Sequence, residues 1–100
     1  MARFDVYQYS DEVPLVLDVQ ADLLADLKTR AVIPLLPHAQ AKKEELPRLK
    51  PALRIKGKNY VMMTTDIGTI KISDLGKLVE NIESQRQVII QAVDFLFQGF

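Results

Sequence analysis

The sequence contains no cysteine, so it can form neither a disulfide framework nor a thiolate metal site. His38 is the single histidine, which excludes paired histidine ligands and a two-histidine acid–base pair. It lies in a polar segment flanked by prolines, and we interpret it as solvated. No apolar run is long enough for a membrane span. Charges also interrupt the N-terminal MARFDVYQYSDE, where a secretory signal would be apolar. We therefore expect a cytoplasmic protein with no membrane partner.

The chain also lacks net charge, because 13 Lys and Arg residues balance 13 Asp and Glu residues. A neutral protein has no overall electrostatic attraction to nucleic acid. The balance varies along the chain: residues 1–41 carry a net −3, residues 42–58 a net +5 and residues 59–100 a net −2. The basic segment 42–58 could face an acidic partner or form a solvated loop, and the sequence leaves both interpretations open.

Length and composition indicate one domain over residues 1–100, since 48% hydrophobic and 26% charged residues are typical of a folded unit. Alternating apolar and polar residues predict short strands at 3–9, 15–20, 31–33, 52–55, 60–65 and 69–72, the last being the final strand. Pro34 and Pro37 predict that this short third strand either lies at an edge of the sheet or ends there. A hairpin turn is expected at 56–59, where Gly57 and Asn59 tolerate positive φ. Short helical segments are expected within 21–27 and 39–46. Six or seven such strands suggest a small barrel or sandwich.

The C-terminal part has a helical period that starts at Ser84, which is placed to cap the helix. One apolar stripe consists of Ile89, Val93, Leu96 and Phe100. Further apolar side chains widen it on both sides: Ile90, Phe97, Val88 and Phe95. A surface helix needs only one stripe. The surplus predicts burial against the barrel, a homodimer contact or an exposed partner surface.

Motifs for catalysis are scarce, and we expect no catalytic residues, no metal site and no cofactor. There is no Gly-rich phosphate loop, and Ser and Thr have no nearby general base. Asp18, Asp22 and Asp26 are four residues apart and could suit a divalent ion, although a solvated acidic face is the simpler interpretation. A ribonuclease site without histidine or metal could still use the following side chains: Arg30, Arg54, Thr64 and Asp66.

Four segments in a characteristic order carry a family resemblance. They are FDVY, LDVQADLL followed by RAVIPL, MMTTDIGTIKIS followed by LG, and the terminal DFLFQGF. Together they resemble the CcdB family of toxins from type II toxin–antitoxin systems, over the range from Phe4 to Phe100. The resemblance implies a mainly β fold with a C-terminal α-helix, the SH3-like barrel of CcdB, MazF and Kid toxins, assembled as a homodimer.

The resemblance also implies a target and a site. Toxins of this family bind the gyrase A subunit through the ends of their C-terminal helices and trap the gyrase–DNA cleavage complex, without catalysis. The implied gyrase-binding residues are Leu23, Leu24, Asp94, Phe97, Gln98, Gly99 and Phe100. The sequence departs from the family pattern at Gln98, where the best-known member has a tryptophan, a frequent interface hot spot. The chain could therefore poison a gyrase with a different pocket, be weakly toxic or have lost the activity.

A CcdA-like antitoxin is the second implied partner, because its disordered C-terminal segment folds on the toxin. The basic segment offers a surface for an acidic peptide: Lys42, Lys43, Arg48, Lys50 and Arg54. DNA is expected only indirectly, through antitoxin or gyrase. Two alternatives stay open because fold does not fix function: a MazF-like endoribonuclease, and a non-toxic relative that only binds antitoxin.

Overall fold

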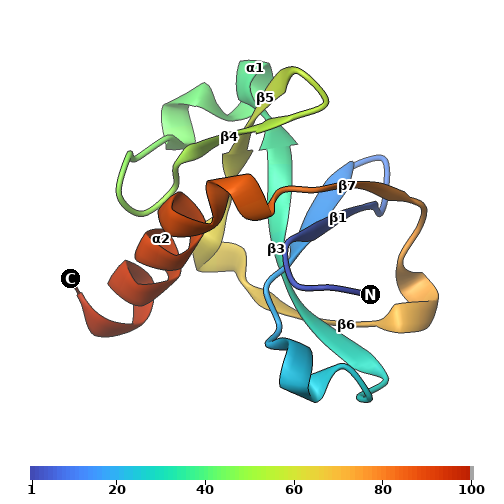
Figure 1. Cartoon of the computed structure of the whole chain (residues 1–100). Coiled ribbons are helices and arrows are strands. Elements are labelled where there is room, and N and C mark those ends of the chain that lie inside the picture. Colours follow the sequence, from blue (N-terminus) through green and yellow to red (C-terminus); the bar gives the residue numbers. More distant parts are fainter. Residues whose placement is uncertain (100) are drawn as a thin grey trace.

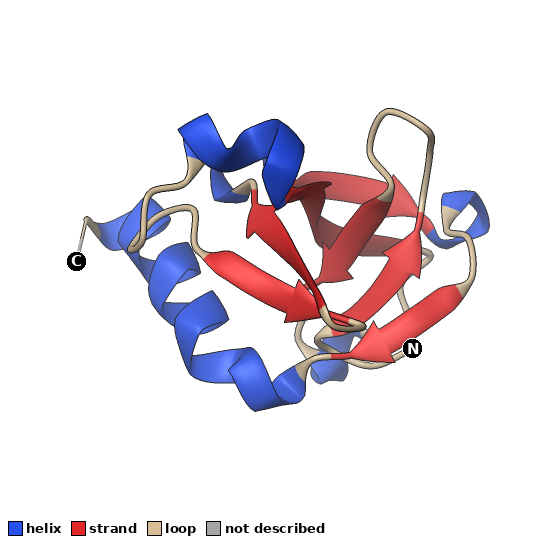
Figure 2. Cartoon of the chain, turned by 90° about the horizontal axis from the view of Figure 1, so that it is seen from above, coloured by secondary structure: helices blue, strands red, loops and turns tan. Residues whose placement is uncertain are grey.

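Antiparallel strands form one curled sheet in the computed structural model, which describes residues 1–99 (Figure 1). The strand order is β4-β5-β3-β2-β1-β7, and β6 pairs with the remaining part of β3. The helix α2 follows the last strand and packs beside the sheet (Figure 2). The predicted mainly β fold with a C-terminal helix is confirmed, and the sheet is curled into a half-barrel. The strands are β1 (Asp5–Gln8), β2 (Leu15–Asp18), β3 (Thr29–Pro37), β4 (Ala52–Ile55), β5 (Lys58–Met62), β6 (Gly68–Lys71) and β7 (Leu78–Asn81), and the helices are α1 (His38–Ala41) and α2 (Arg86–Gln98).

The third strand differs most from its prediction, because β3 is nine residues long and central rather than short and at an edge. It contains Pro34, which faces Val16 of β2. The Pro34 carbonyl accepts the Met63 N–H at 2.9 Å, whereas the Ala31 carbonyl accepts from Val19 on the β2 side. The N and O atoms of one strand residue point to the same side. The position of the missing Pro34 N–H is therefore the point where the neighbour of β3 changes from β6 to β5. Its absence interrupts no backbone hydrogen bonding between paired strands.

The strand β7 was not predicted, and it pairs with β1 as the seventh strand of the sheet. Its burial does not alternate, since Leu78 is exposed while Val79 and Glu80 are both half-buried. Gly76 brings the chain close to β1, donating its N–H to the Gln8 carbonyl at 2.8 Å. A Cβ on Gly76 would lie 2.8 Å from that same oxygen, so only glycine fits this crossing.

The main core lies between the inner face of the sheet and α2. It contains Phe4, Val6, Leu17, Ile33, Leu35, Leu53, Ile55, Met62, Ile82, Ile89 and Ala92, together with Leu15 and Val19. A smaller cluster of Tyr7, Val16 and Val32 lies on the other face, and Leu75 from the segment between β6 and β7 packs on it. The strand β1 is thus buried on both faces, which explains why Asp5 and Tyr7 are buried as well as Phe4 and Val6.

Side chains, rather than backbone pairing, bridge the two ends of the sheet. Gln85 donates its amide to the Arg54 carbonyl at 2.7 Å and accepts the Arg54 N–H at 3.0 Å, as a neighbouring strand would. Glu80 of β7 accepts the Lys56 N–H at 2.8 Å. The β4 edge is therefore joined to the region of β7, and the half-barrel is held closed there.

Two local predictions need correction. The two-residue hairpin between β4 and β5 places positive φ at Lys56 and Gly57, whereas Asn59 lies within β5. Both central residues have positive φ, as a type I′ turn requires. Ser84 does not cap α2, because a 3-10 turn at Glu83–Gln85 precedes the helix and Gln85 is its N-cap, with no side-chain cap hydrogen bond. Within residues 1–99, no helix is long and apolar enough to cross a membrane.

Candidate partner-binding surface

The helix α2 divides into a buried face, two flanks and a polar outer strip. Ile89 and Ala92 are fully buried in the core, and Val93 packs partly against it. The outer strip has i, i+4, i+7, i+11 spacing and is exposed along its length: Gln87, Gln91, Asp94 and Gln98. Gln98, where the family resemblance leads one to expect tryptophan, therefore belongs to a solvent-facing polar row.

The C-terminal turns of α2 carry more apolar surface than the core covers. Phe95 and Leu96 are only half-buried, and Phe97 is 69% exposed. The surplus apolar residues predicted from the sequence are therefore divided, with the first half of the helix in the core and the last turn facing solvent. The exposed Phe97 ring, with the half-buried Phe95 and Leu96 beside it, is therefore available for contact with a partner.

Gly99 ends the helix in the left-handed conformation, with φ of 79°, and donates its N–H to the Phe95 carbonyl at 2.9 Å. A Cβ there would meet nothing within 4 Å, so glycine is needed for its φ and not for space. Phe100, the last residue of the expected gyrase site, lies outside the described residues.

Leu23 and Leu24 lie on an exposed 3-10 turn, Asp22–Leu24, and Leu23 is 97% exposed. This turn, light blue at the bottom of Figure 1, is distant from the C-terminal end of α2. It lies near the start of the helix, because Asp22 and Arg86 line one hollow of about 200 Å³. The rise of α2 from Arg86 to Gln98 is roughly 18 Å. The two parts of the expected gyrase site are therefore separate patches within one chain.

A second hollow, of about 450 Å³, lies between these patches along one flank of α2. It is lined by Ile90, Val93 and Asp94 of the helix and by Arg3 and Arg86, which also line the hollow at Asp22. The resulting surface runs from the 3-10 turn at Asp22–Leu24 past the two arginines toward Phe97. Sequence reasoning missed Arg3 and Arg86, because no pattern connects residue 3 to a helix that begins at residue 86.

The two arginines are positioned by Phe4. The Arg3 guanidinium lies 5.0 Å from the centroid of the Phe4 ring, and that of Arg86 lies 5.5 Å from it. Arg3 also donates its Nε–H to the Val19 carbonyl at 3.1 Å. Phe4 has φ of 73°, which is rare for a bulky side chain, and backbone hydrogen bonds to Asp18 and Ile82 hold it there. The cation–π contacts therefore fix two cations beside the apolar flank of α2.

The expected antitoxin-binding residues lie on the 3-10 turn after α1, on the loop before β4 and on β4, and Arg48 reaches the other flank of α2. Lys42, Lys43, Arg48 and Arg54 are exposed, and Lys50 is half-buried with its ammonium 3.3 Å from Glu44. The solvated interpretation of His38 is wrong, since its Nε2 lies 2.7 Å from the Glu45 carboxylate and both are about two-thirds covered. The Arg48 guanidinium lies 4.3 Å from the centroid of the Phe95 ring, so the basic segment contacts α2.

A buried polar cluster replaces part of the solvated acidic face expected from the aspartates. Asp18 is fully buried and accepts the Arg30 Nε–H at 2.7 Å, while its other oxygen accepts the Gln20 N–H at 3.0 Å. Burial raises the pKa of Asp18 more than these hydrogen bonds lower it. The terminal nitrogens of Arg30 are buried without an acceptor among residues 1–99. Asp22, in contrast, is exposed, and its Oδ1 accepts the Arg3 backbone N–H at 2.9 Å.

This cluster bears on the ribonuclease alternative. Arg30 and Thr64 both have fully buried side chains, so neither can contact RNA in this structure. Only Arg54 and Asp66 of that set are exposed. Across the described chain, no group of three or more acidic or histidine side chains is arranged to hold a metal ion.

A comparison of the sequence with models of protein families identifies the family. The sequence model of the family described as "CcdB protein" matches residues 3–99, nearly the whole chain. The chain belongs to the CcdB family. Membership of this family makes it a toxin of a toxin–antitoxin system, and the curled sheet with its C-terminal helix is consistent with the CcdB fold. The match includes the 3-10 turn at Asp22–Leu24, the basic segment and all of α2.

Proposed function

We propose that the chain is a non-catalytic toxin that binds the gyrase A subunit and traps the gyrase–DNA cleavage complex. The observation that carries the proposal is the end of α2, where Phe97 is exposed and Gly99 turns the chain beyond the helix. A protein that acts by binding needs an exposed hot-spot side chain on a rigid element, because ordering a flexible segment on binding costs affinity. The proposed contact residues are Leu23, Leu24, Asp94, Phe97, Gln98, Gly99 and Phe100.

A homodimer is part of the proposal, because the expected site is divided within one chain. Leu23 lies near the start of α2, and Phe97 lies at its end. A second copy related by a twofold axis would supply both patches again on the other side of the assembly. We expect a dimer in sedimentation velocity at micromolar concentration. A chain that stays monomeric while it still traps cleaved DNA would contradict this part.

The antitoxin part of the proposal rests on the exposed basic side chains around α1 and the β4–β5 hairpin. A CcdA-like antitoxin with an acidic disordered segment would fold onto Lys42, Lys43, Arg48, Lys50 and Arg54. DNA would be reached only through the antitoxin or gyrase. A gyrase poison acts where the chromosome is, so the proposal places the protein in the cytoplasm.

A DNA-cleavage assay with purified protein and the gyrase of its own host tests the main proposal. We expect the wild-type chain to increase covalently cleaved DNA, and removal of residues 98–100 to abolish the increase. Gln98→Trp, measured beside the wild type, tests the departure from the family pattern. Higher potency would indicate that glutamine weakens the contact, and lower potency would indicate a gyrase pocket adapted to it. Cleavage of RNA without gyrase, or no cleavage complex at all, would overturn the proposal.

A further inference from the structure

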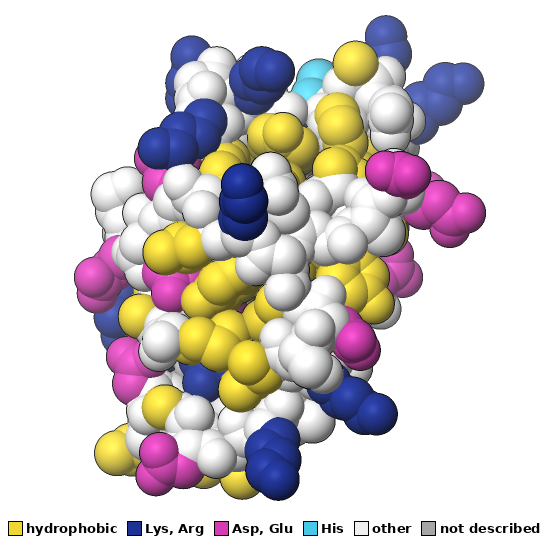
Figure 3. Space-filling model, turned by 90° about the vertical axis from the view of Figure 1, so that its right-hand side faces the viewer, with side chains coloured by type: hydrophobic (Ala, Val, Ile, Leu, Met, Phe, Trp, Pro, Cys, Tyr) yellow, Lys and Arg dark blue, Asp and Glu magenta, His cyan; other side chains and the backbone are white. Residues whose placement is uncertain are grey.

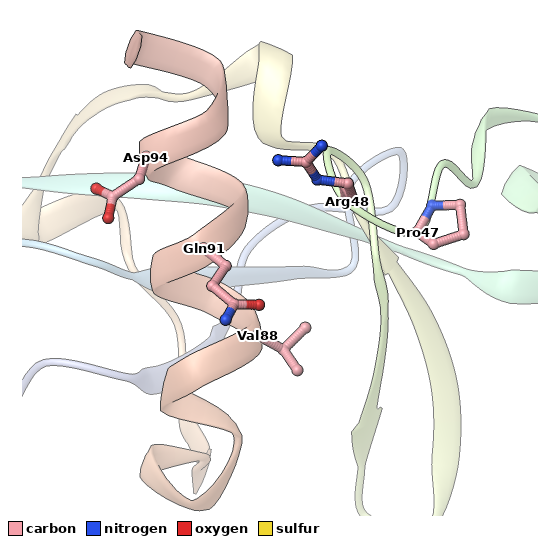
Figure 4. A pocket seen from close by; sticks show the side chains of 5 residues that line it. All are labelled: Pro47, Arg48, Val88, Gln91 and Asp94. Atoms are coloured by element: carbon pink, nitrogen blue, oxygen red, sulfur yellow. The ribbon is translucent and has the colours of Figure 1, made fainter. Parts of the chain in front are cut away.

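A hollow on the second flank of α2 borders the hollow that contains Arg3 and Arg86, and Gln91 and Asp94 line both of them. It has a volume of about 400 Å³ and is lined by Pro47, Arg48, Val88, Gln91 and Asp94 (Figure 4). We call it the Arg48 hollow. We propose that it seats one apolar side chain of an extended acidic peptide, whose neighbouring carboxylate binds Arg48. The inference rests on the proposed function, because an antitoxin tail is the partner that it would serve.

Arg48 is presented for a carboxylate. Its guanidinium stacks over the Phe95 ring at 4.3 Å, and the Arg48 side chain is exposed to solvent. Stacking on an aromatic face leaves the N–H edge of the guanidinium open, and that planar edge matches the two oxygens of a carboxylate. The contact with Phe95 also fixes the side chain before binding, which lowers the entropy cost of forming the pair.

The apolar wall of the hollow favours an apolar side chain next to that carboxylate in the peptide. Val88 is 43% exposed, and Pro47 is exposed across from it, so one apolar side chain can fit between the loop and the helix. Gln91 points toward the same side in Figure 4, and its amide can both donate to and accept from an extended backbone. Asp94 projects away from Arg48 in Figure 4, so it does not compete for the guanidinium.

The surrounding charge favours an acidic occupant. Residues 42–58 carry seven basic and two acidic side chains, and each acidic side chain is paired with a nearby side chain. Glu44 contacts Lys50, and Glu45 contacts His38. Lys and Arg side chains gather at the top of the molecule in Figure 3, the end that carries α1 and the β4–β5 hairpin in Figure 1. This uncompensated field would attract a chain of carboxylates toward the Arg48 hollow.

A nucleic acid fits these observations less well. Phosphates would be attracted by the same cations, but they would leave the apolar wall at Val88 and Pro47 uncovered. Base stacking needs exposed aromatic side chains, and near the hollow the Phe95 ring is already covered by Arg48. The test below therefore includes a DNA probe as an outcome that would overturn the proposal.

The experiment is a fluorescence-anisotropy titration of the full chain with two short labelled peptides. One repeats two glutamates and a leucine, and the other has serine in place of each leucine. We expect the leucine peptide to bind roughly tenfold more tightly than the serine peptide. Arg48→Gln should weaken the leucine peptide roughly tenfold or more, while Lys71→Gln, an exposed charge on β6, should change it less than about twofold. Val88→Ser should weaken the leucine peptide and leave the serine peptide unchanged.

Several results would overturn the proposal. Equal affinity for the two peptides would show that the hollow does not bind an apolar side chain. Equal loss from Arg48→Gln and Lys71→Gln would show attraction by general charge. A labelled DNA duplex that binds more tightly than either peptide, and that Arg48→Gln also weakens, would assign the surface to nucleic acid. Thermal melting of each variant checks that the fold is intact. The gyrase-cleavage assay on the wild type separates the two proposals, because peptide binding without cleavage, or cleavage without peptide binding, fails only one of them.

Discussion

At the scale of single residues, the buried Asp18–Arg30 pair dominates the polar interior. Its two side chains are completely covered, with 2.7 Å between Arg30 Nε and Asp18 Oδ2. Burial of two charges is costly, and two guanidinium nitrogens remain without an acceptor in the described chain. Such a pair contributes little net stability, but removal of one partner leaves the other charge buried and uncompensated.

Arg30→Met should therefore lower the free energy of unfolding by about 3–5 kcal/mol. Combining it with Asp18→Leu should recover most of this loss, because no buried charge remains. Arg54→Met, which removes an exposed arginine, serves as control and should change stability by less than about 0.5 kcal/mol. Urea unfolding measures all three. A double variant as unstable as Arg30→Met would contradict the interpretation.

Tyr7 is the second residue whose burial has a measurable consequence. Its hydroxyl donates to Asp5 Oδ2 at 3.0 Å, and burial together with that contact raises its pKa to about 12. For Asp5 itself, burial acts to raise the pKa, but hydrogen bonds from Asn81, the Ala2 N–H and Tyr7 hold it below the ordinary value. The fold therefore favours a neutral tyrosine beside an ionised aspartate.

The pH dependence of stability follows from the sign of the Tyr7 shift. Since the folded-state pKa exceeds the unfolded value of 10.0, the contribution is complete below pH 10 and is lost as the pH rises toward about 12. We expect the free energy of unfolding to fall by roughly 2–3 kcal/mol across this window. Tyr7→Phe should remove this component and also one tyrosinate absorbance step near pH 12. The same fall in stability in both proteins would contradict the assignment.

At the scale of elements, the half-barrel depends on Gln85 as well as on strand pairing. Its amide satisfies both backbone groups of Arg54, which would otherwise form part of an open edge on β4. The side chain comes from the 3-10 turn that leads into α2, so the start of the helix and the last edge of the sheet are fixed together.

Gln85→Ala should cost about 1–3 kcal/mol of stability, because it leaves an N–H and a carbonyl of Arg54 unpaired. The loss should be visible in hydrogen exchange as faster exchange of the Arg54 N–H, while the N–H groups between β2 and β3 stay protected. Gln87→Ala, on the exposed strip two residues later, is the matched control and should have little effect. Unchanged protection at Arg54 in the Gln85 variant would show that the closure does not depend on this contact.

At the scale of the whole molecule, the surfaces proposed for partners are separated from the groups that hold the fold. Phe97 and Leu23 are largely exposed, whereas Ile89 and Ala92 anchor the same helix in the core. Substitutions at the exposed positions should therefore alter binding without loss of stability.

Phe97→Ala should leave the free energy of unfolding within about 0.5 kcal/mol of the wild type. It should reduce the yield of gyrase-cleaved DNA at a given protein concentration roughly tenfold or more, as expected for an aromatic hot spot. Leu23→Ala tests the other patch in the same assay. Ile89→Ala is the opposite case and should destabilise by about 2–5 kcal/mol, because it opens a cavity in the core. A Phe97 variant with full potency would show that the end of α2 is not the contact.

The sequence by itself determined most of the elements and the family. Two-residue alternation located β1, β2, β4, β5 and β6 to within a few residues, and the change to a helical period located α2, because side-chain periodicity records which face is buried. The surplus apolar residues of α2 indicated more apolar positions than one packed face can cover, but left burial, a dimer contact and an exposed surface as alternatives. The basic segment 42–58 was visible as charge alone.

Only the tertiary structure decided the features that depend on which segments meet. The position of Pro34 in a central strand depends on a change of neighbouring strand, from β6 to β5. The burial of Asp18 depends on Arg30 arriving beside it, and the edge closure depends on Gln85 reaching Arg54 from 31 residues away. Arg3 lines one hollow together with α2, and Arg48 stacks on Phe95, so these features also depend on residues far apart in the chain. A local sequence pattern encodes which side chains of a segment are buried and which are exposed. It does not encode which distant segments pack beside it, and those long-range contacts define the proposed partner-binding surfaces.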